Sequence, residues 1–161
     1  MKFEIRNTDL AKRAALNVGK FNSLYNEFTQ ALLQYLVSSK REFPIDVKDA
    51  GSASFVLFSR EVKPEFQFTY DSTKSRFIGV VSFHLRVADG YTPLSALFFD
   101  ELGNTYFSES ITSASTGIGE EKTARVAVSQ VAAAIMEVQE LTGVCAELSA
   151  RAAKYNDQFK S

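Results

Sequence analysis

The chain offers few side chains that could act as a base, a nucleophile or a metal ligand. His84 is the only histidine and Cys145 the only cysteine, so a metal site or a Ser-His-Asp arrangement would have to depend on His84 alone. His84 alternates with apolar residues in a predicted strand. Cys145 lies between Val144 and Ala146 on an apolar helix stripe, where a thiol is inert. We therefore expect no catalytic residue, no metal site and no cofactor.

Two pairs of adjacent acidic residues resemble the carboxylate pairs of acid/base catalysis. They are Asp100 with Glu101 and Glu120 with Glu121. Neighbours in sequence point to different sides of a strand or a helix, so carboxylates at this spacing do not converge on one substrate atom. Charges in a turn and at a helix start explain both pairs. The sequence thus indicates a protein that is not an enzyme.

A stretch rich in Ser and Gly, residues 113–119, separates a predicted strand from a predicted helix. A loop in this position can offer backbone N–H groups to a phosphate. However, the GxxxxGK[ST] spacing is absent, and Glu120 and Glu121 stand where an anion would approach. We interpret the stretch as a flexible connector that leads into a helix start.

The charges are distributed unevenly along the chain, although the net charge is only −1. Residues 1–86 carry a formal charge of +4, residues 87–121 carry −6 with no basic residue, and residues 122–161 carry +1. Such asymmetry predicts a basic face and an acidic face on one small molecule. The alternative is that these charges only solvate the surface.

Basic residues would gather if the two predicted helices, at about 9–41 and 120–159, lay antiparallel. The end of the second helix would then meet the start of the first, and basic or aromatic sheet residues would extend the patch along a single nucleic-acid strand. The candidate nucleic-acid-binding residues are Lys12, Arg13, Lys20, Lys74, Arg76, Arg86, Arg151, Lys154, Lys160 and Tyr70. The alternative is that the helix-end bases only complement a helix dipole.

The first helix carries the strongest periodic pattern in the chain. Thr8 is its predicted N-cap, Asp9 suits the first turn, and Phe43-Pro44 predicts the stop near residue 41. Apolar residues recur at alternating steps of three and four, which is typical of a helix-helix seam. They are Leu10, Ala14, Val18, Phe21, Tyr25, Phe28, Leu32 and Tyr35.

Both predicted helices are long for one small domain. At 1.5 Å per residue they would measure about 50 and 60 Å, whereas a compact domain of this size is roughly 40 Å across. Parts of both stripes would then be buried against another copy of the chain, so we expect a homo-oligomer, a dimer or a tetramer. The alternative is a helix break at Gly19 or Gly143.

Between the helices the apolar period changes to two, which predicts strands. Five strands are expected in a meander at about 53–111, namely 54–62, 66–71, 77–87, 94–100 and 105–111. Lys63-Pro64 is expected to separate the first two strands, and Ser72-Thr73-Lys74-Ser75 and Glu101-Leu102-Gly103-Asn104 are expected turns. Short connections make neighbouring strands antiparallel.

The sequence therefore predicts one α+β domain over residues 1–161, a five-stranded antiparallel β-meander flanked by two long amphipathic helices. Its function is predicted to be non-enzymatic binding of single-stranded DNA or other nucleic acid with little sequence specificity, as a homo-oligomer. The alternative is a protein-interaction module, such as a bacterial or phage inhibitor or adaptor, that binds a partner protein through the acidic stretch 87–121 or an exposed strand edge. The single cysteine and the charged first residues favour a cytoplasmic protein without a membrane segment.

Overall fold

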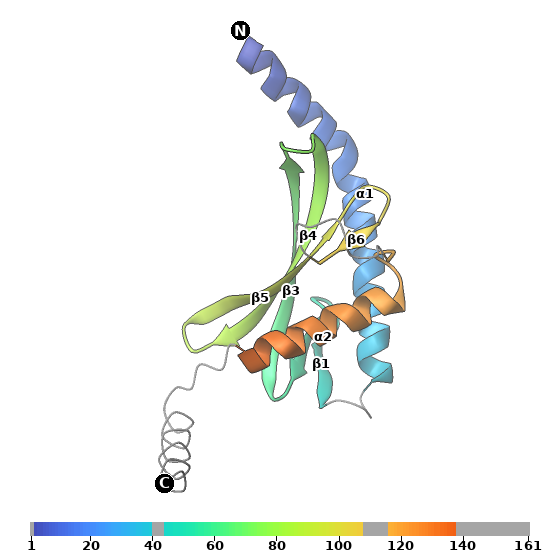
Figure 1. Cartoon of the computed structure of the whole chain (residues 1–161), viewed down its shortest axis with the longest axis vertical. Coiled ribbons are helices and arrows are strands. Elements are labelled where there is room, and N and C mark those ends of the chain that lie inside the picture. Colours follow the sequence, from blue (N-terminus) through green and yellow to red (C-terminus); the bar gives the residue numbers. More distant parts are fainter. Residues whose placement is uncertain (1, 40–43, 108–115, 138–161) are drawn as a thin grey trace, which may run out of the picture.

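The computed structural model describes residues 2–39, 44–107 and 116–137. These residues form a six-stranded sheet and two helices in the order α1 (Lys2–Ser38), β1 (Ile45–Asp49), β2 (Ser54–Leu57), β3 (Arg60–Asp71), β4 (Arg76–Val87), β5 (Gly90–Phe99), β6 (Thr105–Tyr106) and α2 (Glu121–Glu137). Each strand pairs antiparallel with the next one along the chain, so the sheet is a meander (Figure 1). The α+β class and the antiparallel sheet are therefore confirmed.

Both described helices pack on one face of the sheet (Figure 1). The apolar stripe of α1 buries Phe21 and Phe28. Their ring centroids lie 5.0 Å from that of Phe68 and 6.3 Å from that of Phe83, respectively. The two-residue period of β3 and β4 turns Phe side chains toward the helices. The predicted seam of α1 thus packs on the sheet as well as on α2.

The opposite side of the sheet, here called the outer face, is covered by neither described helix. On this face the exposed Gln67 and Thr69 of β3 pair with Val80 and Ile78 of β4, and Phe98 of β5 lies next to Val80. Polar and apolar side chains therefore share a surface that can meet a ligand.

Several strand boundaries differ from the predicted ones, since β5, for example, begins at Gly90 instead of residue 94, and the count is six rather than five in the described residues. The predicted strand 54–62 is divided by a two-residue turn, because Phe58 and Ser59 adopt positive φ angles of 52° and 61°. Positive φ at both central residues is the geometry of a tight hairpin turn, which Asn-Gly usually forms. The Phe-Ser pair at this position therefore does not predict a turn. Strand β1 is short and was not predicted.

Proline 64 does not separate two strands, contrary to the prediction. Strand β3 runs through Pro64, which pairs with Phe83 of β4, whereas the pairing of β2 with β3 ends at Val62. A proline is tolerated where one side of the strand needs no backbone donor. The result is one long β3–β4 hairpin that reaches the turn at residues 72–75, as predicted.

Helix α1 starts earlier than predicted and does not break. It begins at Lys2, so Thr8 is not an N-cap, and it continues through Gly19 to Ser38. Lys2, Glu4 and Arg6 are good helix formers, and the apolar stripe marks only where the helix begins to contact the sheet. With 37 residues, the helix is about 55 Å long, and its first turns project beyond the sheet (Figure 1).

Helix α2 crosses α1 instead of running antiparallel beside it (Figure 1). Residues 116–119, which lead into α2, set this direction because hydrogen bonds attach them to the β5–β6 turn. The Ile118 amide donates to the Gly103 carbonyl at 2.7 Å, and the Thr123 hydroxyl donates to the Gly117 carbonyl at 2.7 Å. Gly119 also lies against Glu27, in the middle of α1. This end of the predicted flexible connector is therefore held by hydrogen bonds.

The remainder of the predicted second helix, residues 138–159 with Gly143 and Cys145, lies outside the described residues. The first part of the connector, residues 113–115, also lies outside them. No helix within the described ranges is long and apolar enough to span a membrane.

Candidate functional site

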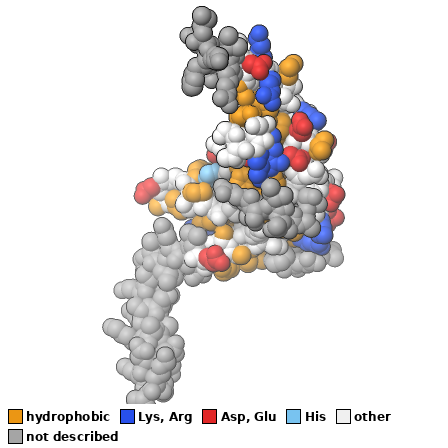
Figure 2. Space-filling view, turned by 45° about the horizontal axis from the view of Figure 1, so that its top comes forward, with side chains coloured by type: hydrophobic (Ala, Val, Ile, Leu, Met, Phe, Trp, Pro, Cys, Tyr) orange, Lys and Arg blue, Asp and Glu red, His pale blue; other side chains and the backbone are white. Residues whose placement is uncertain are grey.

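The structure places seven of the ten candidate residues. Lys12, Arg13 and Lys20 are exposed on the first half of α1. Tyr70 is the next-to-last residue of β3, Lys74 lies in the β3–β4 turn, and Arg76 and Arg86 lie near opposite ends of β4. Arg151, Lys154 and Lys160 lie outside the described residues. Figure 2 shows basic side chains toward the projecting end of the molecule, with acidic ones among them.

Residues far apart in the sequence meet at the tip of the β3–β4 hairpin. The Arg13 guanidinium carbon lies 5.7 Å from the centroid of the Phe77 ring, which is 5.1 Å from that of Tyr70. Contacts of a cation with the face of an aromatic ring are attractive. Lys74 lies in the β3–β4 turn, and Arg76 directly follows this turn as the first residue of β4. We call Arg13, Tyr70, Lys74, Arg76 and Phe77 the hairpin-tip cluster.

A cavity of about 240 Å³ lies between α1, the β3–β4 turn and the β5–β6 turn. It is lined by Arg13, Asn17, Ser75, Arg76, Phe77, Asp100, Glu101 and Leu102. The Asp100 carboxylate stabilises the β5–β6 turn, because it accepts hydrogen bonds from the backbone amides of Leu102 at 3.0 Å and Asn104 at 2.9 Å. This confirms the interpretation of Asp100 as a turn residue.

Arg86 does not belong to the cluster. It lies ten residues along β4 from Arg76, a separation of about 33 Å in a strand. The Arg86 guanidinium donates a hydrogen bond to the Glu61 carboxylate at 3.0 Å. The same carboxylate accepts a hydrogen bond from the Lys48 ammonium at 2.9 Å. Hydrogen bonds from Lys48 and Arg86 hold the pKa of Glu61 below its usual value, and the Glu61 bond raises the pKa of Arg86. Arg86 therefore forms an ion pair with Glu61.

The other two α1 bases differ in their relation to the cluster. Lys20 follows Arg13 by seven residues, so it lies about two turns away on the same side of the helix, whereas Lys12 is turned by about 100°. His84, at the far end of the sheet, has its Nε2 3.5 Å from a Glu65 carboxylate oxygen. Among the residues that the structure describes, no group of three His, Cys, Asp or Glu side chains could hold a metal ion.

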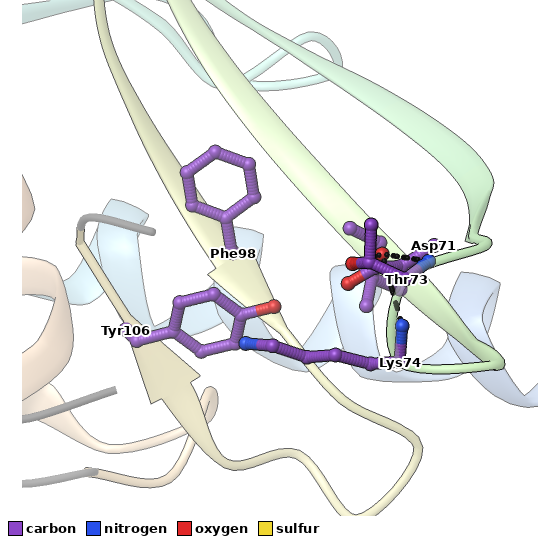
Figure 3. Close-up of a pocket in the computed structure, with 6 residues that line it drawn as sticks. Asp71, Thr73, Lys74, Phe98 and Tyr106 are labelled. Atoms are coloured by element: carbon purple, nitrogen blue, oxygen red, sulfur yellow. Dashed lines mark hydrogen bonds between the residues drawn. The ribbon is translucent and has the colours of Figure 1, made fainter. Parts of the chain in front are cut away.

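A larger cavity of about 440 Å³ opens on the outer face beside the hairpin tip (Figure 3). Its lining residues are Asp71, Thr73, Lys74, Ile78, Phe98 and Tyr106. Only Lys74 was predicted. The missed signal was the pair Phe98-Phe99: in a strand two adjacent aromatic residues face opposite sides, and with Phe99 buried in the core, Phe98 must face outward.

Asp71 is held as a carboxylate at the rim of this cavity. Its Oδ1 accepts the Thr73 hydroxyl at 2.5 Å, the Thr73 amide at 3.0 Å and the Lys74 amide at 3.4 Å. The hydroxyl bond of Thr73 is the largest cause of a pKa below the usual value for Asp71, and the two amide bonds act in the same direction. Asp71 is therefore an ionised acceptor near neutral pH.

Tyr106 is fixed by Arg76. The Arg76 Nη2 donates to the phenol oxygen at 3.1 Å, and the guanidinium carbon lies 5.5 Å from the ring centroid. Burial raises the pKa of Tyr106, while Arg76 acts in the opposite direction. The phenol thus stays neutral near pH 7, and its ring forms a fixed wall of the cavity.

The comparisons with known proteins returned nothing, since neither a protein-family model nor a curated protein nor a solved structure matches this chain. Function must therefore be inferred from the geometry of the chain itself.

Proposed function

We propose that this protein binds single-stranded nucleic acid, without enzymatic activity, through the hairpin-tip cluster and the adjoining outer face. One observation carries the proposal: Arg13 of α1 lies beside the Phe77 ring, which contacts the Tyr70 ring, and Arg76 of β4 lies beside the Tyr106 ring. Lys74, in the turn between β3 and β4, lines the same cavity as Tyr106. Basic side chains neutralise phosphates, and aromatic rings stack on bases of any identity.

A single strand fits this arrangement better than a duplex. The aromatic rings lie at one end of the sheet, on β3, β4 and β6, and they can stack only on bases that are unpaired and turned outward. Phosphate contacts from three cations position the strand and carry no sequence information. Binding along most of the site is therefore insensitive to base identity.

The salt dependence of binding tests this proposal. With three clustered cations, the logarithm of the association constant for a labelled oligonucleotide is expected to fall against the logarithm of salt concentration with a slope of about −2 per chain. Fluorescence anisotropy at several salt concentrations measures this slope. Affinity independent of salt would contradict the proposal. It would favour the alternative that a partner protein binds the acidic β5–β6 turn, where Leu102 is 74% exposed.

Self-association is the second part of the proposal, and it follows from an exposed apolar residue in the first half of α1. Leu16 is 84% exposed there, and a second copy of the chain could cover it. Light scattering is expected to give the mass of at least two chains, and Leu16→Asp is expected to give the mass of one. Val37→Asp, at the other end of α1, serves as control. A wild-type monomer at micromolar concentration would contradict this expectation.

A further inference from the structure

The outer-face cavity has two walls of different chemistry (Figure 3). The β3–β4 turn supplies Asp71, Thr73 and Lys74 on one side, and β5 and β6 supply Phe98 and Tyr106 on the other. Its volume of about 440 Å³ lies within the range of about 300–1,000 Å³ that is typical of small-molecule sites. A planar ring with a polar edge fits such walls.

The aromatic wall of the cavity consists of two rings on which a planar ligand can stack. The Phe98 and Tyr106 rings are stacked on each other, with centroids 5.4 Å apart and planes inclined by 13°. Arg76 holds the Tyr106 hydroxyl.

The polar wall presents an acceptor and a donor. Asp71 uses Oδ1 for the turn, which leaves Oδ2 to accept from a ligand. The Lys74 side chain extends toward Tyr106 across the cavity (Figure 3), and its ammonium is a donor only. A ligand that suits both must present donors to Asp71 and an acceptor to Lys74.

Among the nucleobases, guanine has this pattern on its Watson–Crick edge. The O6 atom is an acceptor, and the adjacent N1–H and N2–H groups are donors that can share the one remaining acceptor oxygen, Asp71 Oδ2. Adenine and cytosine place a ring acceptor beside their amino group, and thymine has one donor between two acceptors. An ionised carboxylate, which only accepts, is repelled by those acceptors.

We propose that this cavity binds one guanine base of a single strand, stacked on Tyr106 and Phe98 and read by Asp71 and Lys74. The inference rests on the proposed function and adds to it one position at which base identity matters. The rest of the strand remains bound by phosphate contacts and nonspecific stacking.

The test compares four oligothymidine hosts of roughly twelve nucleotides, identical except for a central guanine, adenine, cytosine or thymine. The wild-type protein is expected to bind the guanine host about tenfold more tightly than the thymine host. Asp71→Asn is expected to remove this preference. The asparagine oxygen can still accept the turn amides, while its amide donor replaces the free carboxylate oxygen.

Asp49→Asn is the matched control. Asp49 also caps a turn, since its Oδ1 accepts the Gly51 amide at 3.0 Å, but it lies at the end of β1. This variant is expected to keep the guanine preference. Equal wild-type affinity for the four hosts, or an unchanged preference in Asp71→Asn, would overturn the inference and leave the proposed function standing. Binding to none of the hosts at low salt would overturn the proposed function itself.

Discussion

Replacing Gly79 by alanine is expected to lower the free energy of unfolding by about 3 kcal/mol, at the upper end of the usual cost of overpacking a core. A Cβ at this position in β4 would overlap the ring of Phe99 on the neighbouring strand. Phe99 cannot yield easily, because it is fully buried with its centroid 5.6 Å from that of Phe21 and 5.9 Å from that of Phe66.

Gly19→Ala is the matched control, with the opposite expected sign. A Cβ at Gly19 meets no atom within 4 Å, and alanine in a helix interior is more favourable than glycine by about 1 kcal/mol. Urea unfolding followed by circular dichroism, at one protein concentration because association shifts apparent stability, measures both changes. A neutral Gly79→Ala would mean that Phe99 does not pack on β4 as described.

Reversing two charges of the hairpin-tip cluster is expected to weaken oligonucleotide binding by at least about a hundredfold at 0.1 M salt. The variant is Arg13→Glu with Lys74→Glu. Both side chains are exposed, so the fold should tolerate the changes, and each glutamate would repel a phosphate that the original cation attracted. Arg76 is left intact because it fixes Tyr106. Fluorescence anisotropy with the oligonucleotide used for the salt series gives the affinity.

The control must separate a local contact from the effect of net charge. Lys122→Glu with Arg125→Glu makes the same change in charge on exposed positions of α2, which packs on the face of the sheet opposite the outer face. This variant is expected to bind within about threefold of the wild type, since screening at 0.1 M salt limits the reach of a charge to about 10 Å. Equal losses in the two double variants would argue against a localised site.

The fold could be predicted from the sequence where a pattern repeats for long enough. The stripe that includes Phe21 and Phe28 predicts α1, and the alternation through β3 and β4 predicts the central hairpin. Features set by a few residues escaped prediction. The turn at Phe58 and Ser59 has no Gly or Asn, and β1 is only five residues long. The continuity of α1 through Gly19 depends on its neighbours along the helix, since one glycine costs a helix only about 1 kcal/mol.

The candidate site was predicted in part, and partly from a premise that the structure does not support. Antiparallel helices were expected to gather the bases, yet α2 crosses α1. Arg13 instead packs on Phe77 of the hairpin and lines one cavity with Arg76. Strand periodicity places Arg76 and Arg86 on the same face but does not reveal the ion pair of Arg86 with Glu61. Phe98 and Tyr106 become neighbours only through the pairing of β5 with β6, which depends on a short strand.

The order of the strands has a consequence for how the chain folds. Every pair of neighbours in the sheet is also consecutive in the sequence, so each pairing closes only a short loop and costs little chain entropy. Proteins whose contacts are mostly local have a low contact order and fold quickly for their class. The sheet can grow outward from the β3–β4 hairpin, one strand at a time. Only the docking of the two helices has to bring distant parts of the chain together.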